Sequence, residues 1–158
     1  MGNSWNDVGC ALLEFACYDK AETFVQKSLQ IKRSRGFKED SVFCAFNYAE
    51  NYKNLALVRT AQGRHRDAVE LCQKAVGLME LHNDPDSATV LSFRFHLGYA
   101  LYQAGRFDEA LLLHHQVRGS RLRLFGATNV HTLDSFYACS VVLEALGKLD
   151  EARCALPM

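Results

Sequence analysis

One six-residue pattern occurs three times in the 158-residue chain at a constant spacing. It reads GRHRDA from Gly63, GRFDEA from Gly105 and GKLDEA from Gly147, so that 42 residues separate each copy from the next. A period of about 20 to 50 residues is typical of repeat folds, in which each repeat is one supersecondary unit. This periodicity constrains the fold more than any other feature of the sequence.

A second periodic feature accompanies the pattern. A small residue lies seven positions before each of the three glycines, and an alanine lies twelve positions after that small residue. A fourth pair of a small residue and an alanine with the same spacing lies at the start of the chain. Small residues at this spacing predict two antiparallel helices that cross closely, because a large side chain would push their backbones apart. The pairs are Gly9 with Ala21, Ala56 with Ala68, Gly98 with Ala110, and Ser140 with Ala152.

Each repeat is predicted to be a helix, a tight turn and a second helix. The segment ATVLSFRFHLGYALYQA is apolar at helical spacing, and Gly105 follows it as a left-handed helix stop. Asp108, three positions further on, is expected to cap the next helix and to favour its positive end. Arg121 lies on the apolar stripe of that next helix, so we expect its stem to pack there while its charge stays in water.

A single helical hairpin cannot bury its apolar face alone, so successive hairpins must stack. The sequence therefore predicts an all-α fold, a right-handed superhelical solenoid of helix-turn-helix repeats with a concave groove. We expect one domain over residues 1–158, whose last repeat is truncated because its second helix ends before Pro157. The predicted repeats cover residues 1–35, 44–83, 87–126 and 131–156.

These repeats resemble the tetratricopeptide repeat, in the 42-residue variety found in kinesin light chains. NYKNLALVRTAQGRHRDAVELCQKAV is similar to a repeat of that family. The segment LHHQVRGSRLRLFGATNVHTLDS resembles the family's inter-repeat sequence L-G-x-x-H-P-x-T-L at Gly126, Thr132 and Leu133, although Asn129 and Val130 replace the usual His-Pro. The resemblance covers residues 1 to about 154. It implies a scaffold or adaptor that binds a peptide or partner segment in its groove.

The resemblance also implies which residues face that groove. They lie three positions before, one after and four after the small residue of each first helix. The third repeat then offers Phe95, Tyr99 and Tyr102, and the fourth offers Tyr137. Tyrosine combines apolar area with a polar tip, which suits peptide recognition. The competing interpretation is that these rings pack against the neighbouring hairpin.

Lys53 and Asn54 match two sites with which some tetratricopeptide proteins clamp a C-terminal carboxylate. The resemblance implies that Asn54 can hold the backbone of a ligand. Leu57 stands where the clamp needs asparagine, so the clamp is incomplete and binding of a carboxylate tail is disfavoured.

Composition and motifs exclude several classes of function. Lys plus Arg equals Asp plus Glu at 18 each, which gives no general attraction for nucleic acid or anionic lipid, and no apolar stretch is long enough to span a membrane. No G-x-S-x-G, P-loop or H-E-x-x-H motif occurs, and the six cysteines and six histidines lack metal-ligand spacing. We therefore predict no catalysis, no metal and no cofactor. The cysteines are interpreted as buried free thiols of a cytoplasmic protein.

Alternative interpretations stay open at this point. Repeat arrays with this loop pattern often form the sensor end of large signalling ATPases, so the resemblance also fits a C-terminal sensor fragment of a larger multidomain protein. Because the last repeat is short, its apolar face is expected to be partly uncovered. A self-associating module, such as a homodimer through this C-terminal edge, is the other alternative.

Overall fold

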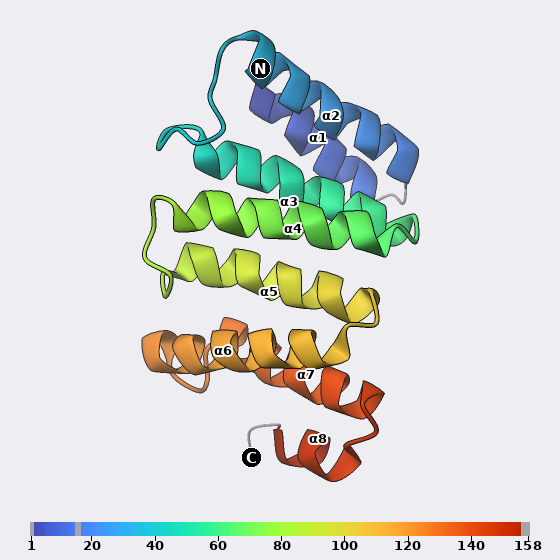
Figure 1. Ribbon diagram of the computed structural model, residues 1–158, viewed down its shortest axis with the longest axis vertical. Coiled ribbons are helices and arrows are strands. Elements are labelled where there is room, and N and C mark those ends of the chain that lie inside the picture. Colours follow the sequence, from blue (N-terminus) through green and yellow to red (C-terminus); the bar gives the residue numbers. More distant parts are fainter. Residues whose placement is uncertain (1, 15–16, 156–158) are drawn as a thin grey trace. The chain divides into compact units, whose positions relative to one another are not determined.

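The computed structural model describes residues 2–14 and 17–155, and within these ranges the chain is entirely helical apart from its turns and loops (Figure 1). The predicted all-α class is therefore confirmed, and the helices alternate with short connections as helix-turn-helix repeats require. The position of Pro157, the predicted end of the last helix, lies outside the described residues. The helices are α1 (Gly2–Glu14), α2 (Tyr18–Ser34), α3 (Ala45–Ala61), α4 (His65–Glu80), α5 (Ala88–Gln103), α6 (Phe107–Phe125), α7 (Val130–Ala145) and α8 (Leu149–Ala155).

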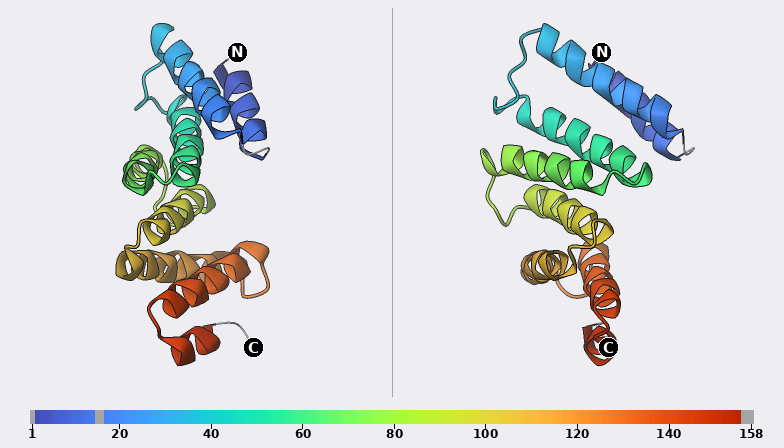
Figure 2. Two further views of the ribbon diagram at one scale, coloured as in Figure 1. Left: turned by 90° about the vertical axis from the view of Figure 1, so that its right-hand side faces the viewer. Right: turned by 45° about the vertical axis from the view of Figure 1, so that its right-hand side comes forward.

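The chain forms two compact units, which we call the N-terminal unit (Met1–Asn83) and the C-terminal unit (Asp84–Met158). In the N-terminal unit α1 packs on α2, α3 packs on α4, and α2 also contacts α3. In the C-terminal unit α6 lies beside both α5 and α7, and α8 packs on α7 (Figure 2). Each unit therefore contains two helical hairpins.

The repeated glycines end the first helix of three hairpins in the same way. Gly105 has a φ of 74°, in the left-handed region, and Gly63 and Gly147 both have a φ of 75°. At Gly105 the backbone N–H of the glycine donates to the carbonyl of Tyr102 (3.0 Å), and the next N–H, of Arg106, donates to the carbonyl of Leu101 (2.9 Å). This pair of bonds is the Schellman motif, which confirms the glycine as the helix stop.

Asp108 does not cap α6, and that expectation was wrong. The residue before α6 is Arg106, which makes no side-chain cap, and Asp108 already lies inside the first turn of the helix. The Schellman turn is so short that it leaves no extended residue in front of the helix. Extended cap residues occur instead at Ser87 before α5 and Asn129 before α7, whose side chains accept backbone hydrogen bonds. Asp108 retains its favourable charge at the positive end of α6.

Arg121 does not keep its charge in water, in contrast to the expectation from sequence. The residue is 5% exposed, and its Nη1 donates to the carbonyl of His131 and to Oγ of Ser135, each at 2.9 Å. Its guanidinium carbon lies 4.6 Å from the centre of the Phe95 ring. Burial lowers the pKa of Arg121. The side chain thus joins α6 to α7, because a buried charge is tolerated only when its hydrogen bonds are made.

The small residues lie at close helix crossings, as the spacing predicts. A Cβ atom on Gly9 would lie 2.7 Å from Cγ2 of Val25, and one on Gly98 would lie 2.6 Å from Cε1 of His114. The atoms nearest to Gly98 belong to His114 rather than to Ala110, one helical turn earlier. Ala110 is nevertheless fully buried in the same interface.

The cysteines whose side chains are described are free thiols. Cys72 and Cys139 are buried, and burial raises the pKa of Cys72 to about 12, so it acts as a small apolar residue. Cys154 is exposed, so the prediction of buried thiols holds only in part. Cys17 and Cys44 are half-buried, and the side chain of Cys10 lies outside the described residues.

Candidate functional site

The C-terminal unit contains an apolar pocket of about 310 Å³, and the four aromatic residues predicted for the groove line it. Its walls come from α5, α6 and α7. We call this site the aromatic pocket. It is lined by Phe95, Tyr99, Tyr102, His114, Asp134, Tyr137, Ala138, Val141 and Val142.

Helical spacing brings these side chains to one place. Phe95, Tyr99 and Tyr102 are separated by four and three positions on α5, so they lie on one face of that helix. Tyr137 and Val141 are four positions apart on α7, which packs near α5 and α6. The pocket is thus formed by two first helices of successive hairpins, with α6 behind them.

The four rings differ in how much they are buried. Tyr137 is 67% exposed and Tyr99 is 42% exposed, whereas Phe95 and Tyr102 are half-buried. The Phe95 ring packs edge-on against His114 at 5.2 Å between ring centres, and Tyr102 packs on Phe107 at 5.6 Å. Two tyrosines therefore offer free surface at the mouth, while Phe95 forms part of the floor.

His114 is a pocket residue that the sequence interpretation missed. It is 2% exposed, and its Nδ1 has no hydrogen-bond partner among the described residues. Burial, the nearby charge of Arg121 and the neighbouring His115 lower its pKa to about 4, against a smaller opposing effect of a hydrogen bond to the backbone of Gly98. The ring is therefore neutral at pH 7.

The sequence did contain one signal for His114. It lies four positions after Ala110, and the corresponding positions after Ala21 and Ala68 hold Val25 and Cys72. A polar residue in a register that is otherwise apolar marks a position at which packing alone does not explain the choice.

The pocket contains one charged lining residue, Asp134, whose side chain is exposed on α7. The remaining lining is aromatic or aliphatic, apart from the tyrosine hydroxyls and His114. Binding sites of this kind combine an apolar wall with a few polar groups that fix orientation. The largely apolar lining suits an apolar or aromatic side chain.

Lys53 and Asn54, the other two predicted site residues, belong to α3 of the N-terminal unit. Lys53 Nζ donates to both carboxylate oxygens of Glu50 at 2.8 Å. Asn54 is 4% exposed, and its Nδ2 donates to Oδ1 of Asn6 at 3.1 Å. The structure therefore gives both residues partners within their own unit.

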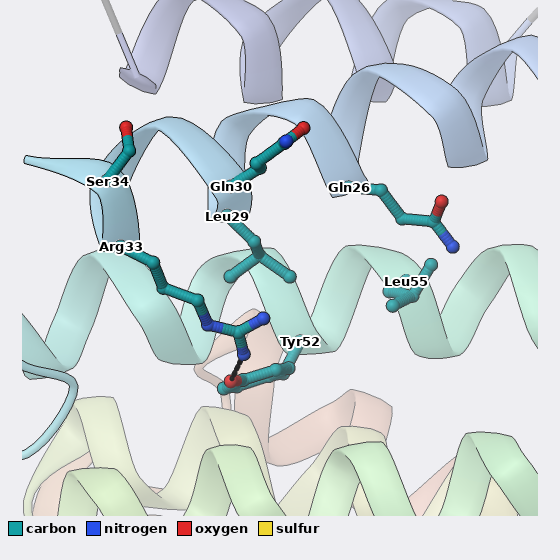
Figure 3. A pocket seen from close by; sticks show the side chains of 7 residues that line it. All are labelled: Gln26, Leu29, Gln30, Arg33, Ser34, Tyr52 and Leu55. Carbon is teal, nitrogen blue, oxygen red and sulfur yellow. Dashed lines mark hydrogen bonds between the residues drawn. The ribbon is translucent and has the colours of Figure 1, made fainter.

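A second pocket, which the sequence interpretation did not anticipate, lies between α2 and α3 of the N-terminal unit (Figure 3). Arg33 Nη2 donates to the hydroxyl of Tyr52 at 3.0 Å, and Arg33 also pairs with Glu39 at 2.8 Å. These polar groups satisfy one another, so this pocket is a weaker candidate than the aromatic pocket. Its lining residues are Gln26, Leu29, Gln30, Arg33, Ser34, Tyr52 and Leu55.

Within residues 2–14 and 17–155, no helix combines the length and apolar character that a membrane crossing requires. Across the side chains that the structure describes, no group of three or more His, Cys, Asp or Glu residues converges as a metal site would require.

Solved structures with the same fold are helical repeat arrays. BtubC (BKLC) from P. vanneervenii superposes on 98% of this chain with a TM-score of 0.83 and 20% identity, and this chain spans 59% of the BtubC chain. Repeats described as belonging to a kinesin light chain from Podosopora anserina match with a TM-score of 0.79 and 18% identity over 98% of this chain and 70% of theirs. MamA of MSR-1 matches with a TM-score of 0.62 and 20% identity, over 98% of this chain and 72% of its own. These likenesses define the class as a solenoid of helical hairpins.

A sequence model of the tetratricopeptide repeat matches residues 47–118, which include α4 and α5 and most of α3 and α6. This segment is similar to the tetratricopeptide repeat, and the fold of the chain is that of the solved kinesin-light-chain-like repeats. No curated protein sequence is similar enough to stand as a further relative. Tetratricopeptide repeats generally mediate protein–protein interaction and are generally not catalytic.

Proposed function

We propose that this chain is a protein-interaction scaffold whose C-terminal unit binds a segment of a partner protein in the aromatic pocket. The observation that carries the proposal is that Phe95, Tyr99, Tyr102 and Tyr137 line a single apolar pocket of about 310 Å³. Aromatic residues that line a pocket are the usual energetic centre of a protein interface.

The expected division of roles follows from burial. Tyr99 and Tyr137 lie at the mouth and contact the partner, because they are 42% and 67% exposed in the free chain. Phe95 and Tyr102 are half-buried and support the walls. Lys53 is proposed as an additional polar contact in the N-terminal unit, for which it must leave Glu50. Asn54 must likewise exchange its hydrogen bond to Asn6 for one to a ligand backbone.

The proposal is tested by selecting binding peptides from a displayed random library with the intact chain. A variant with Tyr99→Ala and Tyr137→Ala serves for counter-selection, and Tyr18→Ala, a tyrosine at the start of α2 that does not line the aromatic pocket, is the matched control. We expect peptides that bind the parent and the control at least about tenfold more tightly than the double variant. Selected peptides that bind all three equally would contradict the proposal.

A cytoplasmic location is a further part of the proposal. It is supported by the free thiols among the described cysteines, because a reducing compartment keeps thiols unpaired. Imaging of a fluorescent fusion of the chain tests it, and exclusive enrichment in a secretory compartment would oppose it.

A further inference from the structure

We propose that two copies of this chain associate when an exposed apolar patch at the start of α3 in one copy docks in the aromatic pocket of the other. This inference rests on the proposed function of the pocket and names a second copy of the chain as its partner. The patch consists of Val42, Phe43 and Phe46, and we call it the α3 patch. It belongs to the N-terminal unit and the pocket to the C-terminal unit, so the contact between copies is head-to-tail.

The three side chains of the α3 patch lie on one face of a helical turn. The backbone N–H of Ala45 donates to the carbonyl of Ser41 at 2.8 Å, so the turn that contains Val42 and Phe43 leads directly into α3. Phe46 follows them by four and three positions, a spacing that brings side chains to the same side of a helix. Phe43 is 90% exposed, Val42 is 65% exposed and Phe46 is 49% exposed. A cluster of exposed apolar side chains of this kind marks an interaction surface.

Side chains of α3 and α4 fix the loop that leads from α2 to this patch (Figure 1). The hydroxyl of Tyr48 donates to the carbonyl of Phe37 at 2.8 Å. The carboxylate of Glu39 accepts from the hydroxyl of Tyr52 at 2.8 Å and pairs with Lys74 at 3.0 Å. Because the loop is already held in the free chain, little conformational freedom is lost when the patch binds.

The aromatic pocket has the volume and the lining that the α3 patch requires. A cavity of about 150 Å³ is large enough to hold a benzene ring. The pocket measures about 310 Å³, so it admits the ring of Phe43 together with part of a neighbouring side chain. Tyr99 and Tyr137 at its mouth offer aromatic rings, beside which another ring packs favourably.

The apolar areas of the two surfaces also match. Val130 and Leu133 are 61% and 40% exposed, and their spacing places them on the same side of α7 as Tyr137, so they extend the apolar wall of the pocket. An aromatic side chain offers about 150–250 Å², so the exposed parts of the α3 patch and of this wall each amount to roughly 400 Å². A stable interface buries at least about 1,200 Å² in total, so the association should be reversible and weaker than about 1 µM.

Sedimentation velocity of the intact chain between about 1 µM and about 1 mM measures this association. We expect the average mass to rise with concentration. Phe43→Ser and the double variant Tyr99→Ala with Tyr137→Ala should each weaken the association at least about tenfold. Leu149→Ser is the matched control, because Leu149 is 57% exposed on α8 and belongs to neither surface, and it should associate like the parent.

A mixture of the two deficient variants tests the head-to-tail arrangement directly. Phe43→Ser retains the pocket, and the double tyrosine variant retains the α3 patch. Their equimolar mixture should therefore form a one-to-one complex with an affinity close to that of the parent, although neither variant associates alone. Circular dichroism of each variant confirms that the loss of association is not a loss of fold.

Four results would overturn the inference. The first is a mixture of folded variants that stays monomeric, and the second is an association lost in Leu149→Ser, which would place the contact at the C-terminal edge. The third is a parent chain that stays monomeric at every concentration, and the peptide selection would then still decide the proposed function. The fourth is a monomeric chain that binds vesicles of phosphatidylcholine and phosphatidylserine through Phe43, which would assign the α3 patch to a membrane.

Discussion

A Cβ atom on Gly98 would lie 2.6 Å from Cε1 and 2.7 Å from Nε2 of His114. Both distances are shorter than carbon and nitrogen atoms tolerate without bonding. The imidazole ring therefore occupies the volume that a side chain on α5 would need. In the first hairpin Gly9 faces Val25 in the same register, and in the second the corresponding residues are Ala56 and Cys72. Glycine in the first helix thus lies opposite valine or histidine in the second, and alanine corresponds to the smaller cysteine.

Gly98→Leu should therefore destabilise the C-terminal unit. Overpacking a filled core costs about 1–3 kcal/mol, because the ring and both backbones must shift. Chemical denaturation of the variant and the parent checks this. A denaturation midpoint equal to that of the parent would show that the assigned contact between α5 and α6 is wrong.

A double variant that changes both Gly98 and His114 tests the same contact. Gly98→Ala alone gains up to about 1 kcal/mol of helix propensity but meets the His114 ring, so its net effect should be unfavourable or near zero. Combined with His114→Cys, which recreates the Ala56 and Cys72 pair, the alanine should become clearly stabilising. Additive effects of the two substitutions would argue against a direct contact.

Stability should fall between about pH 6.5 and pH 4 because of His114. The folded chain holds the pKa of this residue at about 4, below the ordinary value of 6.5, so in this window the unfolded chain binds a proton that the folded chain does not. The contribution is fully present above pH 6.5 and is lost as the pH falls, by up to about 3 kcal/mol. Denaturation at pH 7.5 and pH 4.5 measures the loss. His114→Val should show a markedly smaller loss, and an identical pH profile in the variant would refute the assignment.

Tyr137→Ala and Phe95→Ala should differ in their effect on the stability of the fold. Tyr137 is 67% exposed, so its removal should change the free energy of unfolding by less than about 0.5 kcal/mol. Phe95 packs against His114 and lies under the guanidinium of Arg121, so its removal should cost about 2 kcal/mol or more. Thermal unfolding of both variants provides the comparison, and equal midpoints would mean that Phe95 is not part of the floor.

A reducing agent should leave the thermal midpoint unchanged. The cysteines whose side chains are described are free thiols, and Cys72 and Cys139 are buried. A reducing agent therefore finds no disulfide among them. Unfolding followed by circular dichroism with and without dithiothreitol measures this. A midpoint that drops by several degrees in the reductant would reveal a structural disulfide.

The turns could be predicted from sequence because their backbone conformation is one that few residue types adopt. Gly63, Gly105 and Gly147 all adopt a positive φ, which glycine accepts without steric cost, so the turns were predictable. Helical spacing alone places Phe95, Tyr99 and Tyr102 on one face of α5, whereas the prediction that this face lines a groove came from the family resemblance.

The features that could not be predicted depend on the local path of the chain. Asp108 fails as a cap because the Schellman turn is too short to leave an extended residue before α6. Arg121 is buried because the carbonyl of His131 and the hydroxyl of Ser135 happen to lie within its reach. Asn54 donates to Asn6, a partner 48 positions away in the sequence, and no pattern in the sequence indicated this contact. No periodic pattern encodes which polar groups meet in this way.

The glycine turns have a consequence for how the chain is made. At Gly105 both turn hydrogen bonds join residues no more than five positions apart, and the same bonds recur at Gly63 and Gly147. A turn closed by such local bonds needs no help from residues that have not yet been synthesised. Each of these turns is therefore able to form as soon as it leaves the ribosome, and the second helix of the hairpin then emerges already directed back along the first. Because the turn bonds are local, the hairpins can form in the order in which they are translated, and stacking on the next hairpin then buries their apolar faces.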